Sequence, residues 1–232
     1  MNNSCKDKTL PILSRRTFIA GSLALSCATA LGFSGCESNT ADDRIIRVAA
    51  ADCVDDYDLL KNTYPIIVSA CWHVFESLYE IDKSAGEIAP SIADGEPVQI
   101  DELTYDIKIK TNRKFSDGST LTINDVYASL NSVREDALYS YFYDFVDYGE
   151  VIAETNTLRM HLNYSIGNLL MARMSLIRIY KSTVDNDNTF AGVIGTGPWA
   201  YESGDASNNS DLVFVPNEFY TGNNKANAEQ MI

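Results

Sequence analysis

The side chains best suited to nucleophilic or metal chemistry are few in this chain, which has five cysteines and two histidines among 232 residues. The histidines, His73 and His161, lie far apart, and each sits within an apolar pattern. No group of His, Cys, Asp or Glu has metal-ligand spacing, and the carboxylates are scattered, as is typical of solvated surfaces. The sequence therefore predicts no catalytic residue, no metal site and no cofactor.

The chemistry that the sequence does indicate lies near its start. Arg15 and Arg16 precede an uncharged, largely apolar run, 17–35, which ends in small residues directly before Cys36. This order is typical of an export signal, and the paired arginines indicate the twin-arginine route. A cysteine at such a junction predicts cleavage before Cys36 and lipidation of its thiol. The alternative is an uncleaved membrane-spanning helix, but the Gly, Ser, Thr and Ala content of the run favours cleavage.

These features divide the chain into a signal at 1–35, a polar spacer at 36–43 and one domain at 44–232. Either fate of the signal leaves an exported protein anchored to the outer face of the cytoplasmic membrane. The whole sequence has a net charge of −14, and removal of the signal makes it about −17. Such an acidic surface repels phosphates, so nucleic acid is excluded as the main partner.

Two cysteines remain once the signal has left and Cys36 carries lipid. Cys53 and Cys71 are 18 positions apart in sequence number. In an oxidising exterior they are a candidate disulfide. The alternative is a pair of buried free thiols, which behave as small apolar residues. The sequence leaves both interpretations open.

Patterns along the domain predict helices interleaved with hairpins. Apolar and polar residues alternate from 103 to 110, which is typical of a half-buried antiparallel strand. Thr122 and Asp125 form a capping-box pattern for a helix to about 133, and Pro65 suits the start of a helix that extends to 78. The other expected elements are strands 45–51 and 79–82 and the hairpins 149–154 with 157–162 and 198–201 with 212–215. This order predicts a mixed α/β domain of the α+β type.

Seven short segments of the domain occur in a characteristic order. They are 74–79 (VFESLY), 88–93 (IAPSIA), 103–105 (LTY), 114–122 (KFSDGSTLT), 124–130 (NDVYASL), 194–199 (IGTGPW) and 217–220 (NEFY). The ordered set resembles the extracellular solute-binding proteins of peptide and nickel ABC importers, family 5. Most of these residues have architectural explanations: Phe115 as a core anchor, Thr122 as a helix cap, and Gly195 and Gly197 as a tight bend.

The resemblance implies a lobe of the periplasmic-binding-protein type II kind. In the family, two lobes close on a solute and present it to ABC permease subunits, which is a hinge motion. The expected solute is a peptide or a related compound, with nickel chelates as an alternative, and the expected state is a monomer without catalytic activity. Family members are about twice as long as this chain. It therefore resembles an incomplete N-terminal part that lacks the second lobe.

The resemblance also suggests where ligand is bound. Peptide-binding members pair with their ligand through the loop before the first long helix, which corresponds to Thr63 and Tyr64 here. The alternative is that this loop only starts the helix, with Asn62 or Thr63 as a cap and Tyr64 as a hydrophobic staple. Tyr141, in an aromatic segment near the family's cleft, is the third candidate. Its alternative is packing against the domain's own core.

Two other functions compete with solute binding. The chain is alternatively a truncated remnant that no longer encloses a ligand and acts only as an interaction lipoprotein. A remote alternative is an exported hydrolase, which needs a nucleophile and a base, but His161 has no partner at a recognisable spacing.

Overall fold

The computed structural model describes residues 44–49, 59, 65–82, 85–135, 140–183, 189–204 and 210–232. Residues 44–232 form a unit separate from residues 1–43. The export signal and the spacer lie outside the described residues, so their boundaries remain predictions. Alternating helices and sheets confirm the predicted mixed α/β fold.

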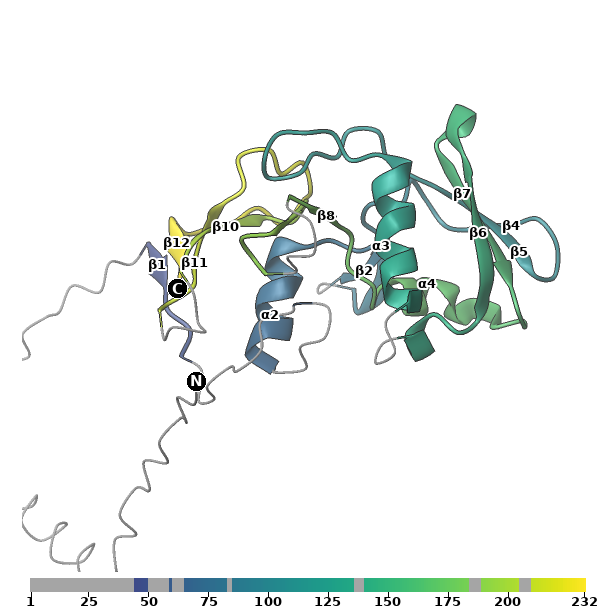
Figure 1. Cartoon of the computed structure of the whole chain (residues 1–232), viewed down its shortest axis with the longest axis horizontal. Coiled ribbons are helices and arrows are strands. Elements are labelled where there is room, and N and C mark those ends of the chain that lie inside the picture. The colour runs from purple at the N-terminus through teal and green to yellow at the C-terminus, as the bar shows by residue number, and fades with distance from the viewer. Residues whose placement is uncertain are drawn as a thin grey trace, which may run out of the picture. The chain divides into compact units, whose positions relative to one another are not determined.

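The largest antiparallel sheet has the strand order β4-β5-β7-β6 and lies to the right in Figure 1. Its strands are β4 (Val98–Gln99), β5 (Thr104–Lys108), β6 (Val146–Ile152) and β7 (Thr157–Leu162). Tyr105 and Ile107 of β5 are buried, whereas Asp106 between them faces outward and forms a bidentate ion pair with Arg159 directly opposite on β7. The predicted alternation therefore produces one core face and one charged face.

The hairpin of β6 and β7 turns where the sequence predicts. A short 3₁₀ helix, Ala153–Thr155, leads to Asn156, whose φ of 52° is left-handed. The Asn156 side-chain amide donates to the Ile109 carbonyl oxygen at 2.7 Å, and the Ile109 N–H donates to the Asn156 carbonyl oxygen at 2.9 Å. The turn is thus attached to the end of the neighbouring strand β5.

Helix α3 (Ile123–Glu135) packs against β6 and β7 and buries Ile123, Val126 and Leu130. The capping box is confirmed, with Asp125 in place of the usual Glu or Gln. The Asp125 carboxylate accepts from the Thr122 N–H at 2.8 Å and from the Thr122 hydroxyl at 2.6 Å. These bonds satisfy polar groups at the start of the helix that have no partner within it.

A second sheet has the order β1-β12-β11-β10 and lies beside helix α2 in Figure 1. Its strands are β1 (Ile45–Ile46), β10 (Trp199–Ser203), β11 (Val213–Pro216) and β12 (Gln230–Met231), and α2 spans Pro65–Val74. The predicted hairpin of β10 and β11 is confirmed. β1 pairs in parallel with β12, so the two ends of the described unit meet in one sheet.

Smaller elements connect these sheets. They are the hairpin of β2 (Tyr79–Asp82) and β3 (Glu87–Pro90), the pair β8 (Tyr180–Ser182) and β9 (Val193–Gly195), helix α4 (Leu170–Met174), and 3₁₀ helices at Ser140–Phe142 and Gly167–Leu169. Two apolar clusters result. One lies around α3 and the β4-β5-β7-β6 sheet, and the other lies around α2, β10 and β11.

Two details differ from the sequence prediction. Helix α2 ends at Val74 and not at 78, and among the described residues β1 covers only Ile45–Ile46 of the expected strand 45–51. The chain bends at 196–198, as predicted around Gly195 and Gly197, although neither glycine has a positive φ angle. Glycine is needed at both positions because the backbone there lies directly against the end of helix α2. A Cβ on Gly197 would lie 2.6 Å from the His73 carbonyl oxygen, and one on Gly195 would overlap the Val74 carbonyl oxygen.

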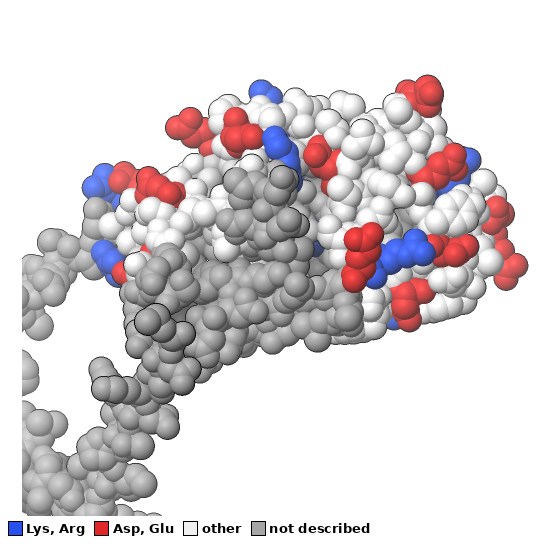
Figure 2. Space-filling model, viewed as in Figure 1, with Lys and Arg blue, Asp and Glu red and all other residues white. Residues whose placement is uncertain are grey.

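The charge distribution fits the acidic composition. On the face shown in Figure 2, Asp and Glu side chains are spread among fewer Lys and Arg side chains, without a continuous basic area. None of the described helices combines the length and the apolar character needed to cross a bilayer.

Candidate functional site

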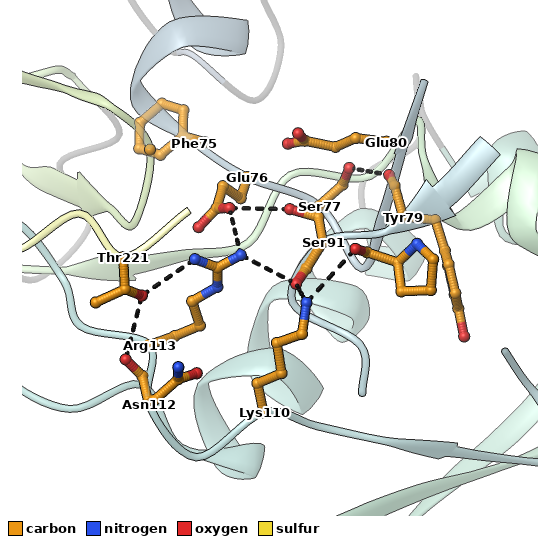
Figure 3. Close-up of polar contacts among 12 residues, drawn as sticks. Phe75, Glu76, Ser77, Tyr79, Glu80, Ser91, Lys110, Asn112, Arg113 and Thr221 are labelled. Atoms are coloured by element: carbon orange, nitrogen blue, oxygen red, sulfur yellow. Dashed lines mark hydrogen bonds and ion pairs between the residues drawn. The ribbon is translucent and has the colours of Figure 1, made fainter. Parts of the chain in front are cut away.

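A polar cluster around the buried Glu76–Arg113 pair joins four segments of the described unit, and we call it the junction cluster: Glu76, Ser91, Lys110, Arg113 and Thr221. The Arg113 guanidinium lies 3.2 Å from the Glu76 carboxylate and donates to the Thr221 hydroxyl at 3.1 Å (Figure 3). The Ser91 hydroxyl donates to Glu76 at 2.9 Å, and Lys110 donates to the Ser91 carbonyl oxygen at 2.6 Å. Glu76 follows α2, so the cluster holds the end of that helix against three loops.

Burial dominates the electrostatics of this cluster. The exposed fraction is 2% for Glu76 and 7% for Arg113. Burial raises the pKa of Glu76 above its ordinary value, while the Arg113 guanidinium acts in the opposite direction. Burial, reinforced by the Glu76 charge, also raises the pKa of Glu80. Because a buried pair of this kind is inaccessible to a solute, the junction cluster is part of the scaffold and not a ligand site.

This cluster corrects one expectation from the sequence. The carboxylates do not all lie on solvated surfaces, because Glu76 is among the most buried polar residues of the described chain. Its position between Phe75 of one apolar cluster and Leu78 of the other explains the burial.

An open hollow of about 420 Å³ offers a better candidate for binding a solute. We call it the Tyr141 pocket, and it is lined by Arg134, Ser140, Tyr141, Tyr143, Asp144, Val146 and Asn163. Its volume is within the range of small-molecule sites. It combines aromatic rings with one cationic and one anionic side chain. Such a lining suits a small polar solute.

The walls of the Tyr141 pocket come from three elements. Arg134 is in the last turn of α3, Tyr141 is in the 3₁₀ helix Ser140–Phe142, and Asn163 follows β7. The Asn163 side-chain amide donates to the Asp144 carbonyl oxygen at 3.0 Å, and its backbone N–H donates to the Phe145 carbonyl oxygen at 2.8 Å. These bonds fix the turn that carries Asp144 to the end of the hairpin.

The predicted ligand residues have different outcomes. The Tyr141 side chain is 57% exposed and lines the pocket, so its ring does not pack in the domain's core. Its contact with a solute remains a prediction. The residues Arg15, Arg16, Cys36, Cys53, Thr63 and Tyr64 all lie outside the described residues. Their assigned roles therefore also remain predictions.

Cys71 is buried on α2, and burial raises the pKa of its thiol to about 12. The thiol is therefore protonated near neutral pH and is a poor nucleophile. Since its candidate partner Cys53 is outside the described residues, the disulfide remains a prediction.

Both histidines make ordinary contacts. His73 Nδ1 lies 2.8 Å from the Ser69 carbonyl oxygen within α2. The His161 ring stacks on Tyr148 with 4.2 Å between centroids, and its Nδ1 lies 3.3 Å from the Thr104 hydroxyl. In the described part of the chain, no group of three or more His, Cys, Asp or Glu side chains is arranged to hold a metal ion.

Sequence reasoning singled out Tyr141 but not the charged residues that line the same pocket. Arg134, Asp144 and Asn163 belong to three separate elements, and nothing in their spacing indicates that the fold brings them together. The aromatic run 139–145 was the only local signal.

The chain matches one family of known proteins over more than half of its length. The sequence model described as "Bacterial extracellular solute-binding proteins, family 5 Middle" matches residues 87–232. None of the curated proteins matches the chain.

Several solved structures have the same fold. NikA from Brucella suis in complex with Fe(III)-EDTA is 23% identical, with a TM-score of 0.66, over 82% of this chain and 39% of NikA. OppA from Listeria monocytogenes bound to peptide is 18% identical, with a TM-score of 0.65, over 82% of this chain and 42% of OppA. MoaA from A. tumefaciens R10 in complex with mannopinic acid is 18% identical, with a TM-score of 0.70, over 81% of this chain and 40% of MoaA.

These likenesses confirm the predicted fold, a periplasmic-binding-protein type II lobe. The chain spans about 40% of the length of these structures.

Proposed function

The chain belongs to family 5 of the bacterial extracellular solute-binding proteins, and on that premise we propose that it is the substrate-binding component of an ABC importer. The family match over residues 87–232 is the observation that carries the proposal. A protein of this kind binds its solute without covalent chemistry and delivers it to permease subunits. The protein is a monomer in this proposal.

The proposed solute is a peptide or a related small compound, and a nickel chelate is the alternative. Similar structures hold a peptide, Fe(III)-EDTA or mannopinic acid, so this fold accommodates several chemical classes. In this proposal the described unit provides one side of the binding cleft, and a second lobe provides the other. The Tyr141 pocket is the part of the described surface that best fits such a role.

The proposed location is the outer face of the cytoplasmic membrane. The signal at 1–35, with Arg15 and Arg16, directs export, and a lipid on Cys36 anchors the mature chain. A Cys36→Ser variant should no longer incorporate labelled palmitate, whereas Cys5→Ser should still do so, because Cys5 leaves with the signal. Palmitate labelling of the Cys36→Ser chain would contradict lipidation at Cys36.

Ligand binding is tested by a thermal-shift screen of the full chain in detergent. The probes are short peptides, nickel–histidine chelates and sugar acids. A ligand at 100 times its dissociation constant stabilises the folded state by about 2.7 kcal/mol. Tyr141→Ala should abolish the shift, and Tyr148→Ala is the matched control, because Tyr148 is an exposed tyrosine that stacks on His161 away from the pocket.

The outcomes separate the proposed function from its rival. A saturable shift with one class of probe supports solute binding and identifies the class. A cooperative melting transition that no probe moves contradicts solute binding by this chain and favours the interaction lipoprotein.

A further inference from the structure

Among the buried polar atoms that have no hydrogen-bond partner in the described part of the chain, two lie at the junction cluster. They are Oε2 of Glu76 and the hydroxyl oxygen of Thr196, and these residues are 2% and 1% exposed. The other carboxylate oxygen of Glu76 is well supplied, because it accepts from the Ser91 hydroxyl and lies against the Arg113 guanidinium (Figure 3). A buried polar atom without a partner costs folding free energy, so both atoms require a partner that no described side chain provides.

The two atoms come from segments that the fold holds together. Thr196 lies in the bend that follows β9, and the N–H of the next residue, Gly197, donates to the Val74 carbonyl oxygen at 2.9 Å. A Cβ on Gly195, at the other side of Thr196, would overlap the same oxygen. Thr196 therefore lies beside the stretch of chain that carries Glu76. Burial raises the pKa of Glu76, and the Thr196 hydroxyl is one of the groups that oppose this rise, as expected of a neighbour.

The surrounding charges decide what kind of partner fits. A cation is disfavoured, because the Arg113 guanidinium lies 3.2 Å from the Glu76 carboxylate and the Lys110 ammonium belongs to the same cluster. An anion is disfavoured by Glu76 itself and by Glu80, on which the Glu76 charge acts. A neutral molecule that both donates and accepts hydrogen bonds avoids both penalties, and water is the smallest such molecule. Polar groups that are neighbours without a direct hydrogen bond are commonly bridged by water.

We propose that one internal water molecule bridges Thr196 and Glu76. The Thr196 hydroxyl donates to the water, and the water donates to Oε2 of Glu76. Folded proteins contain about one buried water per 27 residues, and such waters bond to polar groups that otherwise have no partner. The bridge connects the bend at 196–198 to the short segment between the two apolar clusters, and it does not depend on the proposed function.

The first test is a crystal structure of the full chain at a resolution that defines ordered water. The expected result is a density peak about 2.7–3.2 Å from both Oε2 of Glu76 and the Thr196 hydroxyl oxygen. The absence of that peak would overturn the proposal, and so would a direct hydrogen bond between the two oxygens. A peak surrounded by six or more oxygens at about 2.3–2.6 Å would be a cation and would also overturn it.

The second test is made in solution by nuclear magnetic relaxation dispersion of water, which counts internal waters with long residence times. Thr196→Val replaces the hydroxyl by a methyl group of similar size and should lower the count by one. Thr196→Ser keeps the hydroxyl and should leave the count unchanged. Thr183→Val is the matched control, because the Thr183 hydroxyl already donates to the Gly192 carbonyl oxygen at 2.8 Å.

The variants separate the bridge from a hydroxyl that only fills space. A Thr196→Val chain with the same number of long-lived waters as the wild-type chain would overturn the proposal. A loss that Thr183→Val reproduces would overturn it as well, because the effect would then not be specific to Thr196. If Thr196→Val does not fold, the crystal structure of the wild-type chain alone decides.

Discussion

Replacing Arg113 by Met should remove several kcal/mol of folding stability, because it leaves the Glu76 carboxylate buried without its cation. The two charges are 3.2 Å apart, and at an effective dielectric constant of about 20 their attraction is about 5 kcal/mol. Desolvation offsets part of that attraction when the pair forms, but the cost of breaking a buried pair is about 3–5 kcal/mol. The substitution also removes donors to the Thr221 hydroxyl and the Ser91 carbonyl oxygen.

Urea unfolding measures this loss. The chain has two tryptophans, of which Trp199 is buried, so its fluorescence reports the folded state. Arg113→Met should lose about 3–5 kcal/mol at pH ~8 and less as the pH falls through the raised pKa of Glu76, because the protonated carboxyl no longer needs a cation. Arg44→Met is the control, since its pair with Glu229 is exposed and should be worth at most about 1 kcal/mol.

Equal losses of unfolding free energy for Arg113→Met and Arg44→Met would refute the reasoning, since burial would then have no effect on the cost of breaking an ion pair. A loss for Arg113→Met that does not change with pH would show that the uncompensated Glu76 charge is not its cause. A double variant, Glu76→Leu with Arg113→Met, should recover part of the lost stability, because buried pairs are often replaceable by apolar side chains.

Three other substitutions test the scaffold. Burial raises the pKa of Glu76 above 4.5, so the folded chain retains a proton that the unfolded chain releases. The bound proton therefore adds its full contribution to the unfolding free energy below pH 4.5, and this contribution is lost as the pH rises through the raised pKa of Glu76. Urea unfolding at several pH values should show that the Glu76→Gln chain lacks this pH dependence. Thr122→Ala should cost about 1 kcal/mol in urea unfolding by removing the side-chain partner of the α3 capping box. Gly197→Ala should cost about 2 kcal/mol or more in thermal unfolding, because its Cβ would lie 2.6 Å from a carbonyl oxygen.

Matched variants control two of these results. Ser132→Ala, also in α3, should cost little, because the Ser132 hydroxyl bonds only to the Ala128 carbonyl oxygen of its own helix. Gly149→Ala should be milder than Gly197→Ala, since its nearest neighbour is the Tyr127 side chain at 3.2 Å, which is able to shift. A Gly197→Ala chain as stable as Gly149→Ala would contradict the close-approach argument.

Features that depend on near neighbours in sequence were predictable. The alternation over 103–110 matches β5, and the capping box at Thr122 marks the start of α3, because both patterns report local backbone geometry. The β6–β7 hairpin was also found, since its turn residue Asn156 readily adopts a positive φ.

Features that depend on distant partners were not predictable. Helix α2 was expected to continue to 78, but it ends at Val74, whose carbonyl oxygen accepts from the Gly197 N–H at 2.9 Å. Ser77 then pairs with Arg178 as an isolated bridge, which is incompatible with a further helical turn. The parallel pairing of β1 with β12 was not predictable either, because its two strands come from opposite ends of the domain.

The segments that identify the family and the residues that line the Tyr141 pocket occupy different parts of the chain. Phe115, Glu76 and Trp199 belong to the family-like segments, and all three are buried in the scaffold. Arg134, Tyr143 and Asp144 lie outside those segments and line the Tyr141 pocket. A change of Arg134 or Asp144 alters the charge offered to a solute but touches neither apolar cluster, so stability and solute choice should vary independently. The sequence therefore identifies the fold readily, whereas the solute has to be inferred from the pocket's geometry.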